Sequence, residues 1–350
     1  MLIIGGGIIG SAIALHCARR GLAVRVLDRG EPGGGTTPRS FGLVDVLSPA
    51  GPIYTPVRGQ AVRETGEWLA AASAAAQAQW RVCGSLNPGL GPEAVLEFAR
   101  YGVRAHWWSA ERVRAEEPAL RLRGPGAIHL PDDACVRPAA YLRVVRDAAQ
   151  RQGAIWEEAA VPAIRETPTG WVVAGRTARR VVVAAGVWSP RLVRGLPVDP
   201  VRGTILETAP LPPLLRRYTP DWRQMADGRV WIGTSHEHVG LDATPDPAVA
   251  ERLWAAGVAG LRALAGARIE RTWAGLRPMP ADGLPICGPW PGAEGLFVCV
   301  THSGITLAQW LARRLVTVLA GQEAAELQPF SPGRFRRGRP PLRSPPAAPY

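Results

Sequence analysis

The sequence contains no lysine, and this absence excludes two kinds of chemistry. All 41 basic residues of the 350-residue chain are arginine. A Schiff base with a carbonyl substrate and catalysis by pyridoxal phosphate both need a lysine amine, so neither is available to this protein. Replacement of lysine throughout a chain is typical of a genome rich in G and C, and it is not a sign of function.

The net charge of +12 does not by itself indicate a nucleic-acid partner. The arginines are dispersed along the chain, apart from a cluster at Arg334–Arg339 in a proline-rich terminal stretch. A nucleic-acid-binding protein concentrates basic residues on one face or element of its folded part, and this sequence shows no such concentration. We therefore expect no nucleic-acid partner.

Cysteines and long apolar runs are also scarce. The five cysteines lie far apart, with no C-x-x-C pair and no zinc-ligand spacing, so we expect neither a disulfide framework nor a metal site. The apolar stretch Met1–Leu15 has no basic leader and contains glycines, and it falls short of the ~20 apolar residues that span a bilayer. We expect a cytoplasmic protein without an integral membrane segment.

The N-terminal end of the chain has the pattern of a strand, a glycine-rich turn, a helix and a second strand. Gly5, Gly7 and Gly10 match G-x-G-x-x-G, whose glycines permit a tight turn, a close approach to a pyrophosphate, and packing of helix on strand. Such glycines also mark ordinary turns. The apolar run before them and the acid Asp28 after them indicate a dinucleotide-binding unit instead.

The parts of this unit have predictable roles. A helix over about Ile9–Arg20 directs its free N–H groups and its positive dipole end at the phosphates. A strand over Leu22–Leu27 places Asp28 at its carboxyl tip, where a carboxylate suits ribose hydroxyls and repels a 2′-phosphate, so NADP is disfavoured. Because Met1 stands almost at the glycines, we expect a short first strand, which leaves open a start codon further upstream.

Strand and helix patterns alternate along the rest of the chain. Helices are expected at about 56–78, 92–101, 137–152, 247–264 and 304–319, with strands at 103–108, 154–159, 170–174, 180–184, 201–208, 229–234 and 295–301. We expect an α/β protein with a discontinuous Rossmann-like cofactor domain and an inserted α+β substrate domain on a mainly antiparallel sheet. The expected cofactor domain comprises 1–50, 132–196 and 273–330, the substrate domain 51–131 and 197–272, and a disordered tail 331–350.

Six segments carry a family resemblance. They are the opening glycine-rich unit, Val183–Ser189, Pro200–Gly203, Trp231–Glu237, Gly275–Pro285 and Thr301–Leu307. Taken in this order, they resemble the D-amino-acid oxidase-like FAD-dependent oxidoreductases, the family that includes glycine oxidase, sarcosine oxidase and D-amino-acid dehydrogenases. The resemblance extends from the first strand to about Phe330.

The resemblance implies that the chain binds FAD. The ADP half would lie on the glycine turn, and a helix beginning at Gly304 would direct N–H groups at the negative charge that reduced flavin carries near N1 and O2. An ordinary helix start after a glycine turn is the alternative at Gly304. The residues implied to bind the cofactor are Gly5, Gly7, Ile8, Ile9, Gly10, Asp28, Arg29, Thr36, Thr37, Ser40, Gly42, Leu43, Val161, Ala185, Gly186, Trp188, Arg277, Ser303, Gly304, Ile305 and Thr306.

The candidate catalytic residues are Arg277 and His302. Arg277 matches the arginine that binds the substrate carboxylate in amino-acid-oxidising members of the family, and a guanidinium binds a carboxylate through paired hydrogen bonds. His302 either faces the substrate or packs in the interior. Tyr54 is a further candidate, whereas His236 and Glu237 are expected to stabilise the domain.

The family implies hydride transfer to FAD from the carbon next to the amine of an amino acid or N-substituted glycine. The sarcosine oxidase branch ties FAD to a cysteine where this chain has Gly275-Leu-Arg, so we expect non-covalent FAD. That branch uses a lysine for the reaction with oxygen, and this chain has none, so the acceptor, oxygen or a quinone or protein, stays open. Two alternatives are an FAD-binding accessory subunit of a heteromeric amine dehydrogenase and, from the opening unit alone, a nicotinamide-linked dehydrogenase.

Overall fold

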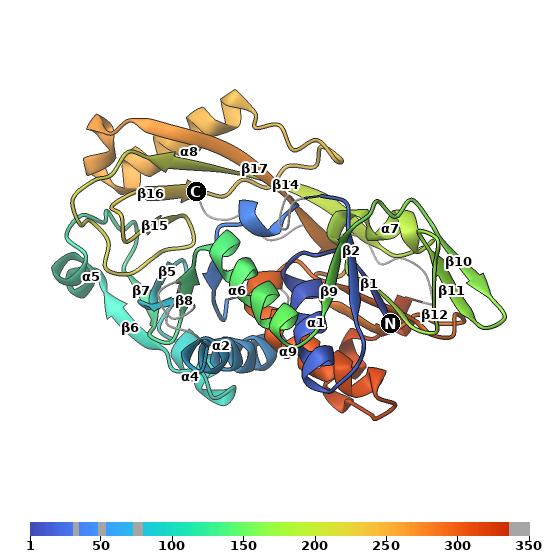
Figure 1. Ribbon diagram of the computed structural model, residues 1–350. Helices are drawn as coiled ribbons and strands as arrows, with labels where there is room; N and C mark the ends of the chain where they lie inside the picture. Colours follow the sequence, from blue (N-terminus) through green and yellow to red (C-terminus); the bar gives the residue numbers. More distant parts are fainter. Residues whose placement is uncertain (31–34, 48–53, 73–79, 336–350) are drawn as a thin grey trace.

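The computed structural model describes residues 1–30, 35–47, 54–72 and 80–335. Its elements form two regions, a six-stranded sheet with its helices and, beside it, a region built on a four-stranded antiparallel sheet (Figure 1). The end of the helix predicted at 56–78 and most of the predicted tail lie outside the described residues.

The six-stranded sheet is the frame of the first region. Its strands follow in the order β18, β19, β13, β1, β2 and β9, all parallel except β18 at one edge. The bounds are Leu2–Ile4 for β1, Arg25–Asp28 for β2, Ile155–Glu158 for β9, Val181–Val183 for β13, Ile286–Pro289 for β18 and Leu296–Val300 for β19. Strands from three parts of the chain are neighbours, which confirms the predicted discontinuous Rossmann-like arrangement.

Successive residues of these strands point to opposite faces of the sheet, so each strand contributes to two buried layers. On one face, Ile3 and Val26 share an apolar cluster with three helices, α1 (Ile8–Arg19), α6 (Pro138–Arg151) and α9 (Gly304–Leu319). On the other face, Leu2 and Ile4 share a cluster with Trp171 of a small antiparallel sheet, β10 (Ile164–Thr167), β11 (Gly170–Val173) and β12 (Arg176–Ala178).

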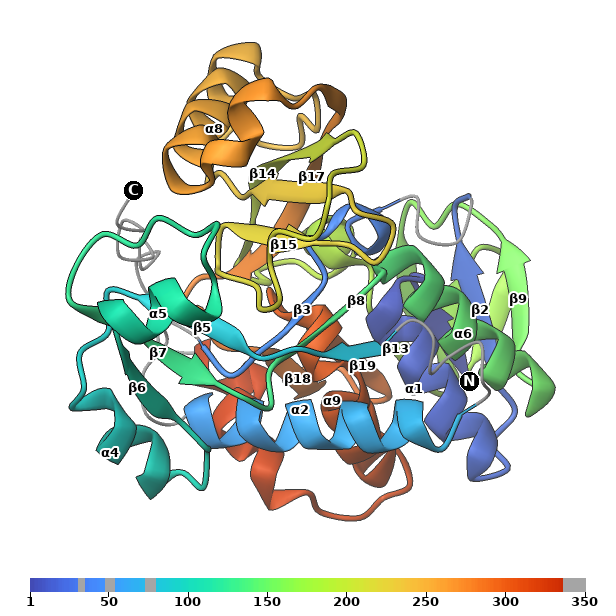
Figure 2. The same ribbon diagram turned by 90° about the vertical axis from the view of Figure 1, so that its left-hand side faces the viewer.

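The second region is built on an antiparallel sheet in the order β15, β16, β14 and β17 (Figure 2). The two long strands β14 and β17 pair over almost their whole length. Helix α8 packs on this sheet through Leu253, in one cluster with Leu206 and Ile232. The bounds are Val198–Thr208 for β14, Trp222–Gln224 for β15, Val230–Gly233 for β16, Ile269–Pro280 for β17 and Pro247–Gly260 for α8.

Shorter elements complete the fold. One small antiparallel sheet consists of β3 (Leu43–Val44), β8 (Ala134–Val136) and β4 (Trp80–Val82), and another of β5 (Ser85–Pro88), β7 (Gly126–Leu130) and β6 (His106–Ser109). The remaining helices are α2 (Tyr54–Ala70), α4 (Ala94–Arg100), α5 (Ala110–Glu116) and α7 (Ser189–Leu192). Helix α2 packs along α9.

The structure departs from two predicted boundaries. The boundary at residue 273 falls inside β17, because Ile269–Pro280 is one continuous strand that pairs with β14. The predicted tail begins too early, because Pro332–Phe335 form a short 3-10 helix. Arg334 fixes this helix by donating to both carboxylate oxygens of Asp282, at 2.7 and 3.0 Å.

Candidate active site

A cavity of about 630 Å³ lies at the carboxyl ends of β1, β2, β13 and β19. This edge of a parallel sheet is where nucleotide ligands bind in open α/β folds. The predicted site residues that line the cavity are Gly5, Gly7, Ile8, Ile9, Asp28, Arg29, Thr36, Thr37, Ser40, Val161, Ala185, Gly186, Trp188, His302, Gly304 and Ile305.

The three glycines of the motif, two in the turn between β1 and α1 and one in the first turn of α1, each have a steric reason. Gly5 has a φ of +105°, and a Cβ there would overlap the carbonyl group of Ala184. A Cβ on Gly10 would overlap the carbonyl oxygen of Gly5, so α1 lies close to β1 only because this position has no side chain. At Gly7, the residue before α1, a Cβ would lie 3.3 Å from the hydroxyl oxygen of Thr37.

Side chains from β2 and the following loop hold this turn in place. Asp28 accepts hydrogen bonds from the backbone N–H of Gly6 at 2.6 Å and of Gly30 at 3.3 Å. Thr37 accepts one from the N–H of Ile8, in the first turn of α1, at 3.1 Å. Asp28 is therefore fixed at the end of β2 with its carboxylate at the cavity wall.

The wall beside Asp28 combines an aromatic ring with a cation. The guanidinium carbon of Arg29 lies 3.8 Å from the centroid of the Trp188 ring. Val161 lines the cavity nearby in the chain after β9, and Ala185 and Gly186 line it after β13. The elements of the six-stranded sheet thus supply one continuous side of the cavity.

The opposite end of the cavity is formed where α9 begins at Gly304, as predicted. A Cβ on Gly304 would lie 3.5 Å from the side chains of Ile8 and Ile9, so the amino ends of α1 and α9 meet. Both helices direct the positive end of their dipole to the same cavity. Two helix amino ends at one cavity favour a ligand that carries negative charge at two places.

His302 lies two residues before the start of this helix and keeps a neutral ring. Its Nδ1 is 3.1 Å from the hydroxyl oxygen of Ser303. Burial, together with the positive charges of Arg277 and Arg58 and the ring of His236, lowers the pKa of His302 to about 3. At neutral pH the ring can exchange hydrogen bonds with a ligand without adding charge.

Arg58 of α2 was not predicted as a site residue. Its side chain is 3% exposed and forms an ion pair with Asp45. It also donates to the hydroxyl of Ser303 at 2.5 Å and to the carbonyl of Val46 at 3.1 Å. Arg58 therefore ties α2 to the start of α9 and brings a second cation close to His302. A charged residue in the buried stripe of a helix is the only sequence signal that could have revealed it.

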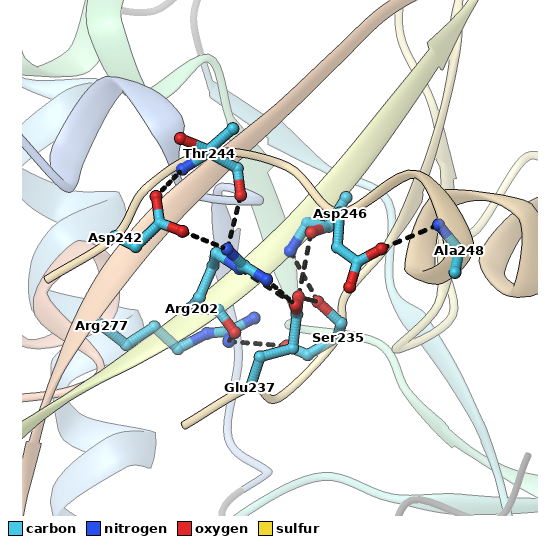
Figure 3. A network of polar contacts seen from close by, with 9 residues as sticks. Arg202, Ser235, Glu237, Asp242, Thr244, Asp246, Ala248 and Arg277 are labelled. Carbon is cyan, nitrogen blue, oxygen red and sulfur yellow. Dashed lines mark hydrogen bonds and ion pairs between the residues drawn. The ribbon is translucent and has the colours of Figure 1, made fainter. Parts of the chain in front are cut away.

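Arg277 lies in the carboxyl-terminal half of β17, outside the lining of the cavity but next to it. Its Nη1 donates to the carbonyl oxygen of Ser235 at 2.8 Å and to that of Arg202 at 3.4 Å (Figure 3). On either side of it in β17, Leu276 accepts a hydrogen bond from the hydroxyl of Thr36 at 2.5 Å, and Pro278 lines the cavity. The half-buried guanidinium is thus held beside the end of the cavity that His302 lines.

The other predicted residues that do not line the cavity have structural contacts. Gly42 has a φ of +78°, and a Cβ there would lie 2.5 Å from the carbonyl oxygen of Val136. The hydroxyl of Thr306 donates to the carbonyl of Leu43 and accepts from the N–H of Asp45, both at 3.4 Å. Gly10 packs α1 on β1, and Ser303 binds Arg58.

The three remaining candidates, Tyr54, His236 and Glu237, lie outside the cavity lining, and several lining residues were missed. Tyr54 is 1% exposed at the start of α2, and its ring packs on Phe330. Glu237 and His236 lie after β16, next to Arg277. Lining residues that were not among the predicted site residues are Ile4, Leu27, Gly30, Gly35, Ala159, Ala160, Pro162, Ala184, Arg191, Leu192, Pro278, Cys299, Val300 and Thr301.

Among the described residues, every helix is too short or too polar to span a bilayer. Within these same ranges, no three His, Cys, Asp or Glu side chains gather in a way that could hold a metal ion.

The sheet order, the glycine turn and the cavity define a dinucleotide-binding α/β protein. Residues 1–317 match the family model for FAD dependent oxidoreductases. Glycine oxidase from Pseudomonas putida is 31% identical over 367 residues, covering 95% of this chain and 98% of that protein. A subunit of opine oxidase from Agrobacterium tumefaciens is 28% identical over 364 residues, covering 96% and 97% of the two chains. The crystal structure of glycine oxidase from Geobacillus kaustophilus has a TM-score of 0.85 at 24% identity, covering 94% of this chain and 97% of that one.

The chain therefore belongs to the FAD-dependent oxidoreductase family that its sequence resembles. The cavity fits FAD, because it joins a glycine turn and helix amino end, an acid at the tip of β2, and a second helix amino end at α9. Gly5, Gly7 and Asp28 would hold the ADP half, and Gly304 and Ile305 would hold the flavin end.

Proposed function

We propose that the protein oxidises the C–N bond of a small amine that carries a carboxylate, of the glycine, N-substituted glycine or D-amino-acid type. The position of Arg277 carries this proposal, since it places a half-buried cation beside the α9 end of the cavity. The names of two similar proteins, both glycine oxidases, support the same substrate class.

The residues of the chain can bind and orient such a substrate. Bound FAD supplies the acceptor for the hydride that leaves the carbon next to the amine. Arg277 binds the carboxylate through charge-assisted hydrogen bonds. The positive charges of Arg277 and Arg58 favour the unprotonated amine, so no side chain has to remove a proton from nitrogen before the hydride leaves. Once the hydride has left, the substrate nitrogen gives up a proton to solvent. Water then hydrolyses the imine to an oxo acid and an amine or ammonia.

The electron acceptor belongs to the same proposal. Bound FAD would pass the electrons to an acceptor, which is either oxygen, reduced to hydrogen peroxide, or a quinone or protein. Peroxide released in stoichiometric amount with the oxo acid in air would identify oxygen. Reduction of a soluble quinone without peroxide would identify the second kind of acceptor. In this proposal the protein is cytoplasmic and its FAD is bound non-covalently. Acid precipitation of the protein should therefore leave all flavin in the supernatant.

The similarity to a subunit of opine oxidase favours a second candidate function. The opine oxidase relative is by its name one subunit of a larger enzyme. A chain of this kind would bind FAD but oxidise its amine only in a complex with its partner. The nicotinamide-linked alternative has no such support, because the family match covers residues 1–317 and includes the segment at α9.

Replacement of Arg277 by alanine tests the assigned carboxylate anchor. We expect kcat/KM for a carboxylated amine to fall roughly 100-fold, because a charge-assisted hydrogen-bonded pair is lost. The methyl ester of the same amine should lose little, because it has no carboxylate. Arg271→Ala is the matched control, since Arg271 lies on the same strand with its side chain 65% exposed. Equal loss for acid and ester, or no loss for either, would contradict the anchor.

A further inference from the structure

A buried network of polar side chains lies directly behind Arg277. Its centre is the ion pair of Arg202 on β14 with Glu237, whose side chains are 6% and 12% exposed. Arg202 donates through Nε to Glu237 at 3.0 Å and through Nη1 to the carbonyl of Thr244 at 2.6 Å and the carboxylate of Asp242 at 3.2 Å. The backbones of Arg202 and Glu237 also exchange two hydrogen bonds, at 2.9 and 3.0 Å.

The carboxylate of Glu237 fixes the segment that follows β16 onto β14. It accepts hydrogen bonds from the hydroxyl of Ser235 and, at 3.0 Å, from the hydroxyl of Thr204. Ser235 in turn accepts from the backbone N–H of Thr204 at 2.8 Å. Burial opposes ionisation of Glu237, but the hydrogen bonds from Arg202, Ser235 and Thr204 hold its pKa below the usual value. Glu237 is therefore a charged group that holds two backbone segments together.

These two segments supply the carbonyl groups that orient Arg277. Nη1 of Arg277 donates to the carbonyls of Ser235 and Arg202, so each acceptor belongs to a residue that Glu237 binds (Figure 3). The guanidinium also lies against Gly203, where a Cβ would overlap it. The orientation of Arg277 is thus set by the backbone on which it rests.

We propose that Glu237 and Arg202 are positioning residues that hold Arg277 in the orientation that binds a substrate carboxylate. This inference rests on the proposed function, because it gives the network a role only if Arg277 is the carboxylate anchor. A binding group must be held close to its productive geometry to be effective, and supporting hydrogen bonds supply that constraint. Glu237, expected from the sequence only to stabilise the domain, then also sets affinity for the substrate.

The test uses the FAD-loaded protein and an unreactive carboxylate, acetate or glycolate, whose binding is followed by the change in flavin absorbance. Glu237→Gln keeps the size of the side chain and removes its charge. We expect the Kd for the carboxylate to rise roughly ten-fold with flavin content near that of the parent protein, while Tm falls because the buried charge of Arg202 loses its partner. KM for a carboxylated amine should rise in parallel, with kcat and the KM of its methyl ester little changed, because a loss of fold would affect acid and ester alike.

Glu207→Gln is the matched control. Glu207 is also a buried acid of β14, 5% exposed, and it accepts a hydrogen bond from Trp231 at 2.7 Å. It lies at the other end of the sheet, opposite Arg271, whereas Arg277 is opposite Val201. Its replacement should leave the Kd for acetate within about two-fold of the parent value.

A second variant covers the case in which Glu237→Gln does not fold. Thr204→Val keeps the shape of a fully buried side chain and removes only its hydrogen bond to Glu237. We expect a rise in Kd of roughly three-fold. An unchanged Kd in the folded variants, with binding lost in Arg277→Ala, would overturn the positioning role and leave the proposed function intact. An unchanged Kd in Arg277→Ala would instead overturn the anchor itself.

Discussion

The position and the hydrogen bonds of Asp28 are determined by residues close to it in the sequence. The acid follows the glycine turn at the distance expected for a ribose-binding residue, and it lies at the tip of β2 on the cavity wall. Its two hydrogen bonds to the backbone of Gly6 and Gly30 follow from the same short segment. Residues of this kind can be predicted because the element that places them is local.

Replacement of Asp28 by asparagine should weaken FAD binding. The amide oxygen can still accept from Gly6, but the charge-assisted hydrogen bonds to ribose hydroxyls are lost, so we expect the Kd for FAD to rise roughly ten-fold. Fluorescence quenching during titration of the apoprotein measures this change. Glu158→Gln is the control, because Glu158 is opposite Asp28 in the neighbouring strand but is exposed and outside the cavity. A shift of equal size in both variants would contradict a specific role for Asp28.

Arg58 and Pro278 mark the limit of prediction for single residues. Arg58 reaches Ser303 across a sequence separation of 245 residues, and Pro278 enters the cavity wall only because β17 pairs with β14. The only local sign of Arg58 is a charge in the buried stripe of α2, and the position of Pro278 in the wall depends on the strand pairing alone. Arg277 was found through the family motif, but its contacts with the carbonyls of Ser235 and Arg202 depend on the same long-range pairing.

Helix α1 begins at the cavity, and its position on β1 depends on the glycine at residue 10. Gly10→Ala should displace it from β1, because the added Cβ would overlap the carbonyl oxygen of Gly5. We expect a loss of about 3 kcal/mol in the free energy of unfolding and loss of FAD binding. Urea unfolding and flavin content measure these two effects. Gly266→Ala is the control, since no atom lies within 4 Å of its Cβ position; equal stability of the two variants would contradict the steric argument.

The contact between α1 and α9 contains a histidine whose titration is coupled to folding. Nε2 of His16 lies 2.8 Å from the side-chain oxygen of Gln309, and burial lowers the pKa of His16 to about 4 despite that hydrogen bond. The unfolded chain takes up a proton near pH 6.5, whereas the folded chain does so only near pH 4. The stability contributed by neutral His16 is therefore present above pH 6.5 and is lost as pH falls through this window.

This coupling predicts a difference between the parent protein and His16→Gln. Between pH 6.5 and 4 the free energy of unfolding of the parent should fall more steeply, by roughly 1 kcal/mol per pH unit. Denaturant unfolding at pH 7, 6, 5 and 4 gives both slopes, and taking their difference removes the contributions of the other titrating groups. Parallel slopes would show that His16 is protonated equally in both states.

The elements differ in how well the sequence predicted them. Helices α1, α6 and α9 and strands β13 and β19 have regular apolar patterns or glycine stops, and the structure places them within a few residues of expectation. Strand β17 was not predicted, because Gly275, Pro278 and Pro280 are unfavourable in strands. Its long pairing with β14 outweighs those local preferences.

At the scale of the whole molecule, the proposed cofactor cavity and the proposed substrate anchor belong to different sheets. The six-stranded sheet and its helices line the cavity that fits FAD, and Arg277 lies on β17 of the four-stranded sheet, which stands beside the first sheet (Figure 1). The fold class followed from the alternation of strands and helices, and the family from six motifs in order. No motif or periodicity of the sequence indicates the side chain of the substrate, because specificity depends on loops whose contacts are set by the whole fold.

An anaerobic absorption spectrum of the purified protein, before and after addition of glycine, sarcosine, proline and D-amino acids, tests the proposed activity directly. We predict oxidised flavin bands that one or more of these amines bleach without any partner protein. Flavin bands that persist with every amine would contradict amine oxidation by this chain alone and would favour the accessory-subunit alternative. A protein that shows no flavin bands even after reconstitution with FAD would contradict the assignment of the cofactor cavity itself.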